Sequence, residues 1–311
     1  MSLPFAFPRA RGRNLAFLLF GILFGTIPFS ALGASSSKQV AKPSSSWLVR
    51  WQPNRLVNGS PVVFRVSSPE ALGSLSGKWL GHDVFFSTTS LGKVWYGIAG
   101  ISLETHPGTY FLELRGTTNA GEELSFKKQV TVGKGKYHSI KASVPKQYTE
   151  PSAEQLHRID EEKTLKERTF ARVTPKPGWG GKFLSPAKAN ISDVFGTART
   201  FNGRVQSVHQ GLDYAVPDGT PVAAMNSGTV LLAQPLFFEG GCVVLDHGQG
   251  LLTLYMHLSK IEAKEGEHIA SGQRIGLSGG TGRATGPHLH VAVRWEGVYL
   301  NPATLLGLEL P

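Results

Sequence analysis

The chain has 311 residues, a formal net charge of +10 and one cysteine. This length allows more than one domain, and a single cysteine excludes an internal disulfide. The positive charge favours contact with anionic envelope polymers or lipid head groups. No helix-turn-helix, zinc-finger or basic-aromatic pattern accompanies the charge, so we expect no nucleic-acid partner.

The first 34 residues have the layout of a secretory signal peptide. Three arginines between residues 9 and 13 precede an apolar run at 15–24, and small residues follow at 31–34. A basic region, an apolar core and a small-residue cleavage site are the three parts of such a signal. We therefore predict residues 1–34 as a signal peptide that exports the chain to the periplasm or cell envelope and is cleaved near Gly33 or Ala34. An uncleaved membrane anchor is the alternative.

A tether and a β-sandwich are predicted next. Residues 35–46 are rich in Ser, Lys and Pro, a composition typical of a disordered tether. Residues 47–133 contain short β-type runs separated by turn residues at the spacing of a sandwich, and their number fits an immunoglobulin-like module. This part has no reactive constellation, so we interpret it as a spacer, a carbohydrate-binding module or a cover for a cleft elsewhere in the chain.

Residues 134–182 are predicted to form a helical linker. Helix formers dominate between residues 152 and 173, with apolar side chains at Leu156, Ile159 and Leu165. This pattern indicates a short amphipathic connecting helix, which the Pro- and Gly-rich stretch 175–181 then ends.

The last part, residues 183–311, consists mainly of strand-forming segments with glycines between them, which suit hairpins and bulges. We predict an all-β chain on this pattern. Cys242 lies in the apolar run Gly-Gly-Cys-Val-Val-Leu, so we expect a buried thiol without a catalytic role.

Five residues of this last part have the chemistry of a metal site. His209 and Asp213 form an HxxxD motif, His288 and His290 form an HxH motif, and His257 lies between them in Tyr-Met-His-Leu. Side chains repeat on one face of a strand every second residue, so either pair could bind one ion. Catalytic zinc usually takes three protein ligands and leaves a fourth position for water. Five candidates are thus available for three ligand places and two auxiliary roles.

An ordered set of motifs extends this pattern across residues 183–306. In chain order they are Val-Phe-Gly-Thr-Ala-Arg-Thr-Phe-Asn-Gly, HxxxD, Gly-Thr-Pro-Val, Asp-His-Gly-Gln-Gly, Tyr-Met-His-Leu-Ser, Gly-Thr-Gly and Gly-Pro-His-Leu-His. The segment resembles the lysostaphin or LytM-type zinc metalloendopeptidases, which hydrolyse peptide bonds in bacterial peptidoglycan. The resemblance implies an antiparallel β-sheet or barrel-like metallopeptidase domain at 183–311, with a groove across one face and zinc at its floor. A short helix would join this domain to the amino-terminal sandwich.

Carried over residue by residue, the resemblance assigns one zinc ion per chain to His209, Asp213 and His290. The remaining pair, His257 and His288, matches the two catalytic histidines. An imidazole can take a proton from the activated water or donate a hydrogen bond to the oxyanion. We expect His288 to be the base and His257 to be the oxyanion partner. The other histidines are expected to be structural or surface residues: His247, His268, His82, His106, His138 and His157.

The sequence therefore predicts a monomeric zinc endopeptidase that hydrolyses peptide cross-links in peptidoglycan. In a diderm envelope, the expected bond joins D-Ala to diaminopimelate. The alternative is a catalytically silent scaffold that binds peptidoglycan or activates a cell-wall amidase, but the complete ligand set argues against it. We also expect the sandwich and helix to cover the groove, so that a chain beginning near Lys182 cleaves faster than the mature chain.

Overall fold

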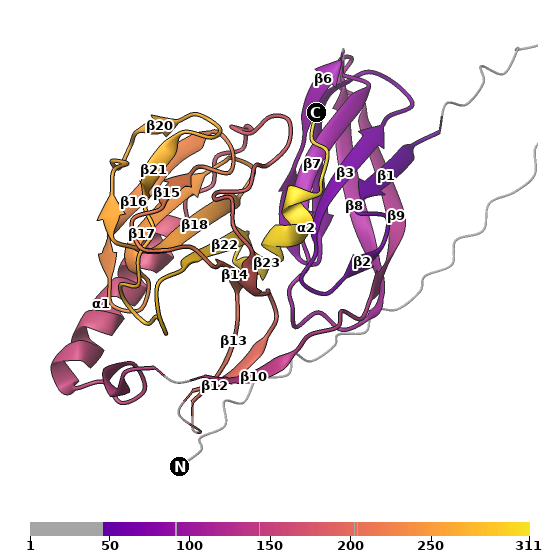
Figure 1. Cartoon of the computed structure of the whole chain (residues 1–311). Coiled ribbons are helices and arrows are strands. Elements are labelled where there is room, and N and C mark those ends of the chain that lie inside the picture. The colour runs from indigo at the N-terminus through magenta and orange to yellow at the C-terminus, as the bar shows by residue number, and fades with distance from the viewer. Residues whose placement is uncertain (1–45, 91, 143, 202, 204) are drawn as a thin grey trace, which may run out of the picture. The chain divides into compact units, whose positions relative to one another are not determined.

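The computed structural model describes residues 46–311 except positions 91, 143, 202 and 204. The predicted signal peptide and all but the last residue of the predicted tether lie outside the described residues. Within the described ranges, no helix is long and apolar enough to cross a membrane. Strands dominate the described chain, which confirms the predicted all-β class (Figure 1).

The amino-terminal part contains two β-sheets (Figure 1). The first sheet has the strand order β1 (Leu48–Gln52), β3 (Pro61–Ser67), β7 (Val94–Gly100) and β6 (Ser87–Ser90). The second sheet has the order β2 (Leu56–Val57), β9 (Glu123–Gly133), β8 (Gly108–Thr118), β4 (Leu72–Trp79) and β5 (His82–Phe85). Neighbouring strands are antiparallel except for β2 and β9.

Side-chain contacts join the two sheets into a sandwich. Phe64 of β3 meets Trp79 of β4 edge to face, with ring centroids 5.5 Å apart. The Trp79 indole also donates a hydrogen bond of 3.0 Å to the carbonyl of Gly100 on β7. Both aromatic rings are fully buried, so the sheets face each other across one core. The immunoglobulin-like identity of this sandwich stays a prediction.

The predicted connecting helix is present, but the linker also contains a strand. Helix α1 (Ala153–Phe170) begins at a capping box, in which Ser152 and Gln155 bond each other's backbone N–H groups. Before it lie β10 (Ser139–Ala142) and the one-turn helix η1 (Lys146–Tyr148). Strand β10 pairs in parallel with β12 (Ala198–Phe201). The strand was not predicted because its four residues, Ser-Ile-Lys-Ala, are too few to show a clear β pattern.

Most strands of the carboxy-terminal part belong to one large antiparallel sheet. Its order is β11 (Ile191–Asp193), β14 (Gly211–Tyr214), β22 (Leu289–Trp295), β18 (Leu251–Leu258), β17 (Gly240–Asp246), β16 (Gly228–Leu236) and β20 (His268–Ile269), with β23 (Val298–Leu300) pairing with β22. A second sheet has the order β15 (Pro221–Ala223), β21 (Arg274–Leu277) and β19 (Lys260–Ile261). Strand β13 (Val205–Val208) forms a hairpin with β12, and α2 (Pro302–Leu306) lies near the end of the chain.

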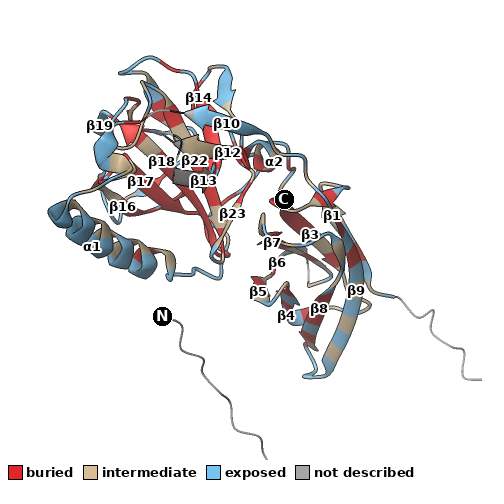
Figure 2. Ribbon diagram, turned by 90° about the horizontal axis from the view of Figure 1, so that it is seen from below, coloured by how far each residue is buried: buried red, intermediate tan, exposed pale blue. Residues whose placement is uncertain are grey.

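The two faces of the large sheet have different surroundings. Successive residues of β22 point to opposite faces. Val291 and Val293 belong to the main core, whereas Ala292 packs in a smaller cluster that includes Leu165 and Phe170 of α1. His290 therefore lies on the α1 side of the sheet. Figure 2 shows these strands mostly buried and much of α1 exposed.

The sandwich also bonds directly to the carboxy-terminal part, and residues 44–311 form one compact unit. The Gln249 side-chain oxygen accepts a hydrogen bond of 3.2 Å from the backbone N–H of Ile98. The backbone N–H of Asn301 donates to the carbonyl of Gly59 at 2.8 Å. Removing the sandwich would therefore expose surface that is now buried.

Candidate active site

The strand register brings two of the predicted ligands together. Asp213 of β14 and His290 of β22 are directly opposite partners. His209 lies just before β14 rather than in it. A side chain at Gly211 would have its Cβ 2.4 Å from Nε2 of His290. The glycine in His-Gln-Gly-Leu-Asp thus leaves the space that the His290 ring occupies.

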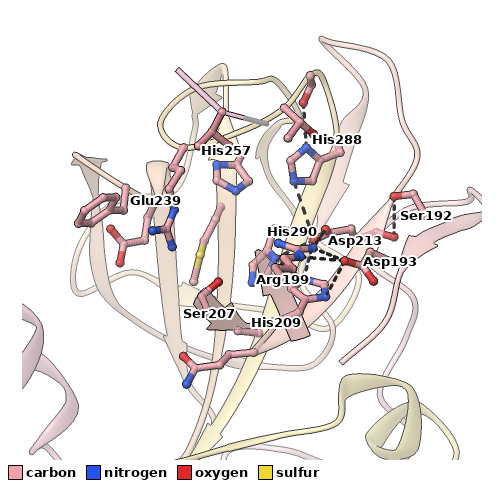
Figure 3. A pocket seen from close by; sticks show the side chains of 18 of the residues that line it. Ser192, Asp193, Arg199, Ser207, His209, Asp213, Glu239, His257, His288 and His290 are labelled. Atoms are coloured by element: carbon pink, nitrogen blue, oxygen red, sulfur yellow. Dashed lines mark hydrogen bonds and ion pairs between the residues drawn. The ribbon is translucent and has the colours of Figure 1, made fainter. Parts of the chain in front are cut away.

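The three predicted ligands present their atoms to one point (Figure 3). Nε2 of His209 lies 3.0 Å from Oδ1 of Asp213 and 3.0 Å from Nδ1 of His290. Nδ1 of His290 lies 2.7 Å from the same Asp213 oxygen. The side chains are buried, with exposed fractions of 1% for His209, 7% for Asp213 and 11% for His290.

The orientation of these groups fits a divalent cation. Nδ1 of His209 donates to the carbonyl of Val194 at 2.8 Å, so in the neutral ring the Nε2 lone pair faces the other two ligands. Burial raises the pKa of Asp213, but hydrogen bonds and charge from His209 and His290 outweigh it and hold that pKa well below its usual range. Two imidazole nitrogens and one carboxylate oxygen form a donor set that catalytic zinc uses.

The two predicted catalytic histidines lie beside this cluster. Their rings are 4.7 Å apart between centroids, and Nε2 of His288 is 3.9 Å from Oδ1 of Asp213. Nδ1 of His257 lies 2.8 Å from the carbonyl of Thr281, and Nδ1 of His288 lies 2.8 Å from that of Gly286. Since each Nδ1 donates to a carbonyl, each neutral ring keeps Nε2 as a proton acceptor.

His257 reaches the site through an unusual backbone conformation. Its neighbour Met256 is the register partner of His290, so strict alternation along β18 would turn His257 to the opposite face. The φ angle of His257 is +62°, in the left-handed region that only glycine adopts freely. Both Met256 and His257 line the same cleft. We attribute the strained backbone to placing the imidazole in this cleft.

The cluster lies in a cleft of about 490 Å³ (Figure 3). All five predicted site residues line it, together with Arg199, Glu239 and Arg283. Ile140 of β10 and Val144 also line it, so the linker contributes to its wall. The expected groove is therefore present, and part of its wall comes from the segment before the predicted metallopeptidase domain.

The remaining candidates have structural surroundings. His247 is fully buried, its Nδ1 lies 2.7 Å from the carbonyl of Ser227, and its Nε2 lies 2.7 Å from the Thr253 hydroxyl. Burial lowers the pKa of His247 to about 4. Cys242 is buried as well, and burial raises the pKa of its thiol. These surroundings agree with the structural roles predicted for both residues.

Sequence analysis missed two charged residues beside the ligands. Arg199 of β12 donates to Oδ2 of Asp213 at 2.6 Å and, through Nε, to Oδ2 of Asp193 at 2.9 Å. Both belong to the segment around Val-Phe-Gly-Thr-Ala-Arg, which contributed to the resemblance but received no role. The available signal was the arginine within that motif and the aspartate immediately before it.

Comparisons with known proteins agree with this geometry. A model of peptidase family M23 matches residues 207–302. The chain is 51% identical over 103 residues to the peptidoglycan DD-endopeptidase ShyA of Vibrio cholerae, covering 33% of this chain and 23% of that protein. It is 42% identical over 127 residues to the DD-carboxypeptidase/endopeptidase Mpg of Neisseria meningitidis, covering 40% and 29%. The chain thus spans less than a third of the length of these two curated relatives.

A solved structure matches over a longer range. The crystal structure of a putative peptidase M23 from Pseudomonas aeruginosa is 31% identical, with a TM-score of 0.63, and the match covers 82% of this chain and 96% of that one. The likeness therefore extends beyond residues 183–311 into the preceding parts of the chain.

Proposed function

This chain belongs to peptidase family M23, and from that premise we propose that it is a zinc-dependent endopeptidase that hydrolyses peptide cross-links in bacterial peptidoglycan. One observation supports the proposal most strongly. The side chains of His209, Asp213 and His290 meet within hydrogen-bond distance of one another, and two further histidines present acceptor nitrogens to the same cleft.

The proposed substrate class is the DD cross-link. ShyA is named a peptidoglycan DD-endopeptidase and Mpg a DD-carboxypeptidase/endopeptidase, although this chain spans only part of their length. We assign the same bond type to this chain, which in a diderm envelope joins D-Ala to diaminopimelate. The proposed compartment is the periplasm or cell envelope, in keeping with the signal peptide predicted at residues 1–34.

The proposed ligands are His209, Asp213 and His290. When bound there, zinc would lower the pKa of a coordinated water to about 7 and polarise the scissile carbonyl. The Val194 carbonyl fixes the His209 ring so that Nε2 faces Asp213 and His290, where it would be available to bind the ion. The Asp213 carboxylate supplies the negative charge that two neutral imidazoles lack.

His288 is the proposed general base. Its Nδ1 is occupied by the Gly286 carbonyl, and its Nε2 faces Asp213 Oδ1 at 3.9 Å, close to the ligand atoms. It can therefore take a proton at Nε2 and later return it to the leaving amine.

His257 is the proposed oxyanion partner, a role that requires a proton on Nε2. Its Nδ1–H is committed to Thr281, and burial, followed by the charges of His290 and His288, lowers the pKa of His257 to about 3. The neutral ring of the folded chain is thus an acceptor at Nε2, so this geometry does not by itself supply the donor that the oxyanion role needs. The division of roles between His257 and His288 stays a prediction.

The test compares His290→Ala, His288→Ala and the exposed control His268→Ala. We expect the wild-type chain and the control to bind about one zinc ion and to convert the cross-linked peptides of purified sacculi into uncross-linked ones. His290→Ala should lose both metal and activity, because it lacks a ligand. His288→Ala should keep the metal and lose activity. Zinc binding without any cleavage would indicate a masked or partner-dependent enzyme, whereas absence of zinc would contradict the proposed function and favour the scaffold alternative.

A further inference from the structure

The turn from Asp193 to Arg199 is bonded to His209 at three points. The Val194 carbonyl accepts from Nδ1 of His209 at 2.8 Å. The backbone N–H of Gly196 donates to the His209 carbonyl at 2.8 Å, and the His209 N–H donates to the Thr197 carbonyl at 2.8 Å. These bonds fix both the ring and the backbone of the first predicted ligand.

Arg199, at the end of the same turn, holds the second predicted ligand. Its Nη2 lies 2.6 Å from Oδ2 of Asp213 and 2.5 Å from Oδ2 of Asp193, and its Nε lies 2.9 Å from that Asp193 oxygen (Figure 3). Asp193 is itself fixed, because its Oδ1 accepts from the Thr197 hydroxyl and from the Val194 N–H, both at 2.8 Å. Asp193 thus fixes the position of the Arg199 guanidinium, and the guanidinium in turn fixes the carboxylate of Asp213.

The two oxygens of Asp213 consequently have different partners. Oδ2 is bonded to Arg199, whereas Oδ1 faces His209 and His290. A carboxylate fixed in this way presents one oxygen to an ion and cannot rotate to present both without breaking a charge-assisted bond.

We propose that Arg199, anchored by Asp193, is a positioning residue that makes Asp213 a one-oxygen metal ligand and thereby sets the metal affinity and coordination geometry of the site. This inference rests on the proposed function, since it concerns the metal that His209, Asp213 and His290 would bind. Outer partners of metal ligands typically alter metal affinity 10- to 100-fold.

The charges explain why Asp193 is part of the arrangement. A guanidinium alone beside Asp213 would cancel the charge that attracts a cation. With Asp193 present, two carboxylates and one guanidinium leave a net charge of −1. Asp193 therefore lets Arg199 orient Asp213 without neutralising the site.

Pairing of β12 with the strands on both sides fixes the backbone position of Arg199. Arg199 is paired with Ile140 of β10 on one side and with Ser207 of β13 on the other. Its side chain is only 19% exposed. The linker strand thus supports the residue that orients the ligand.

Arg199→Lys is the decisive variant because it keeps the positive charge and loses the planar fork that joins the two carboxylates. The matched control is Arg274→Lys, since Arg274 of β21 forms an Arg–carboxylate pair with Glu262 at 2.6 Å that involves no predicted ligand. Zinc affinity is measured by competition with a chromogenic chelator, and the visible absorption spectrum of the cobalt(II)-loaded protein reports the coordination geometry.

We expect Arg199→Lys to bind zinc about tenfold more weakly and to change the cobalt spectrum, while Arg274→Lys matches the wild type in both. Equal affinity within twofold and an unchanged spectrum for Arg199→Lys would overturn the inference. Asp193→Asn provides a second test if Arg199→Lys does not fold, because it leaves the guanidinium unbalanced; unchanged zinc affinity in that variant would also overturn the inference. Failure of the wild-type chain itself to bind zinc would instead overturn the proposed function, and this inference with it.

Discussion

Asp213 and His290 lie directly opposite each other in the register of β14 and β22, and Oδ1 of the first is 2.7 Å from Nδ1 of the second. A pairing of this kind is held by the backbone of two buried strands. The side chains therefore meet before any ion arrives, which reduces the entropy that binding must overcome.

Asp213→Asn tests the charge of this pair with little change in shape. Zinc should raise the Tm of the wild-type chain, because a ligand that binds only the folded state stabilises it. We expect this zinc-dependent rise to disappear in Asp213→Asn, because the amide lacks the negative charge, whereas exposed Asp218→Asn should retain it. Thermal unfolding with and without zinc provides the measurement. A full zinc response in Asp213→Asn would show that the carboxylate is not a ligand.

Gly196 has two separate reasons to be glycine. Its φ angle is +84°, and an added Cβ would lie 2.0 Å from the Tyr137 ring. Gly121 has a similar φ of +87° but open space around it. Gly121→Ala should therefore lower the free energy of unfolding by about 1–2 kcal/mol through backbone strain alone. Gly196→Ala should cost a further 1–3 kcal/mol, because the ring must move. Urea unfolding at neutral pH measures the free energy of unfolding of both variants. Equal losses in the two variants would mean that the Tyr137 contact contributes nothing to the cost of Gly196→Ala.

The sequence was sufficient to predict the cluster of His209, Asp213 and His290, but not the residues that support it. His209 and Asp213 form one local pair and His288 and His290 another, but the two pairs are distant in the chain, so only the family resemblance predicted that they meet. Arg199 depends on pairing between β10 and β12, which are distant in the chain, and β10 has no pattern of its own. His257 could be placed in the site only by its motif, since strand alternation points it to the wrong face. Motifs matched to a family can therefore predict the clustered residues, whereas the residues that bond to them depend on long-range strand pairing.

His247 should make the fold sensitive to mild acid. Burial lowers its pKa from 6.5 to about 4 in the folded chain. Above pH 6.5 His247 is neutral in both the folded and the unfolded chain, so titration of His247 does not lower the free energy of unfolding there. Between about pH 6.5 and 4 the unfolded chain binds a proton that the folded chain does not, so stability falls as pH falls, by about 3 kcal/mol in total.

His247→Gln removes this titration and can keep one donor and one acceptor. We expect it to lose less stability than the wild type between pH 7.5 and 4.5, even if it is less stable at pH 7.5. Exposed His106→Gln is the control and should follow the wild type. The free energy of unfolding is measured in urea with a chelator present, so that loss of metal does not contribute. Identical pH slopes for the two variants would contradict the assignment.

A chain beginning near Lys182 tests whether the preceding segments restrict the cleft. Ile140 and Val144 line the cleft, so removing them should open it and increase the rate on cross-linked muropeptides. The same truncation removes the partner strand of β12, the bond between Lys166 and Glu239, and the contact of Ile98 with Gln249. The shortened chain should therefore be less stable while it cleaves faster. Initial rates must be divided by the zinc-loaded fraction and taken well below the Tm of both chains. Equal or slower rates under these conditions would mean that the linker supports the site rather than covering it.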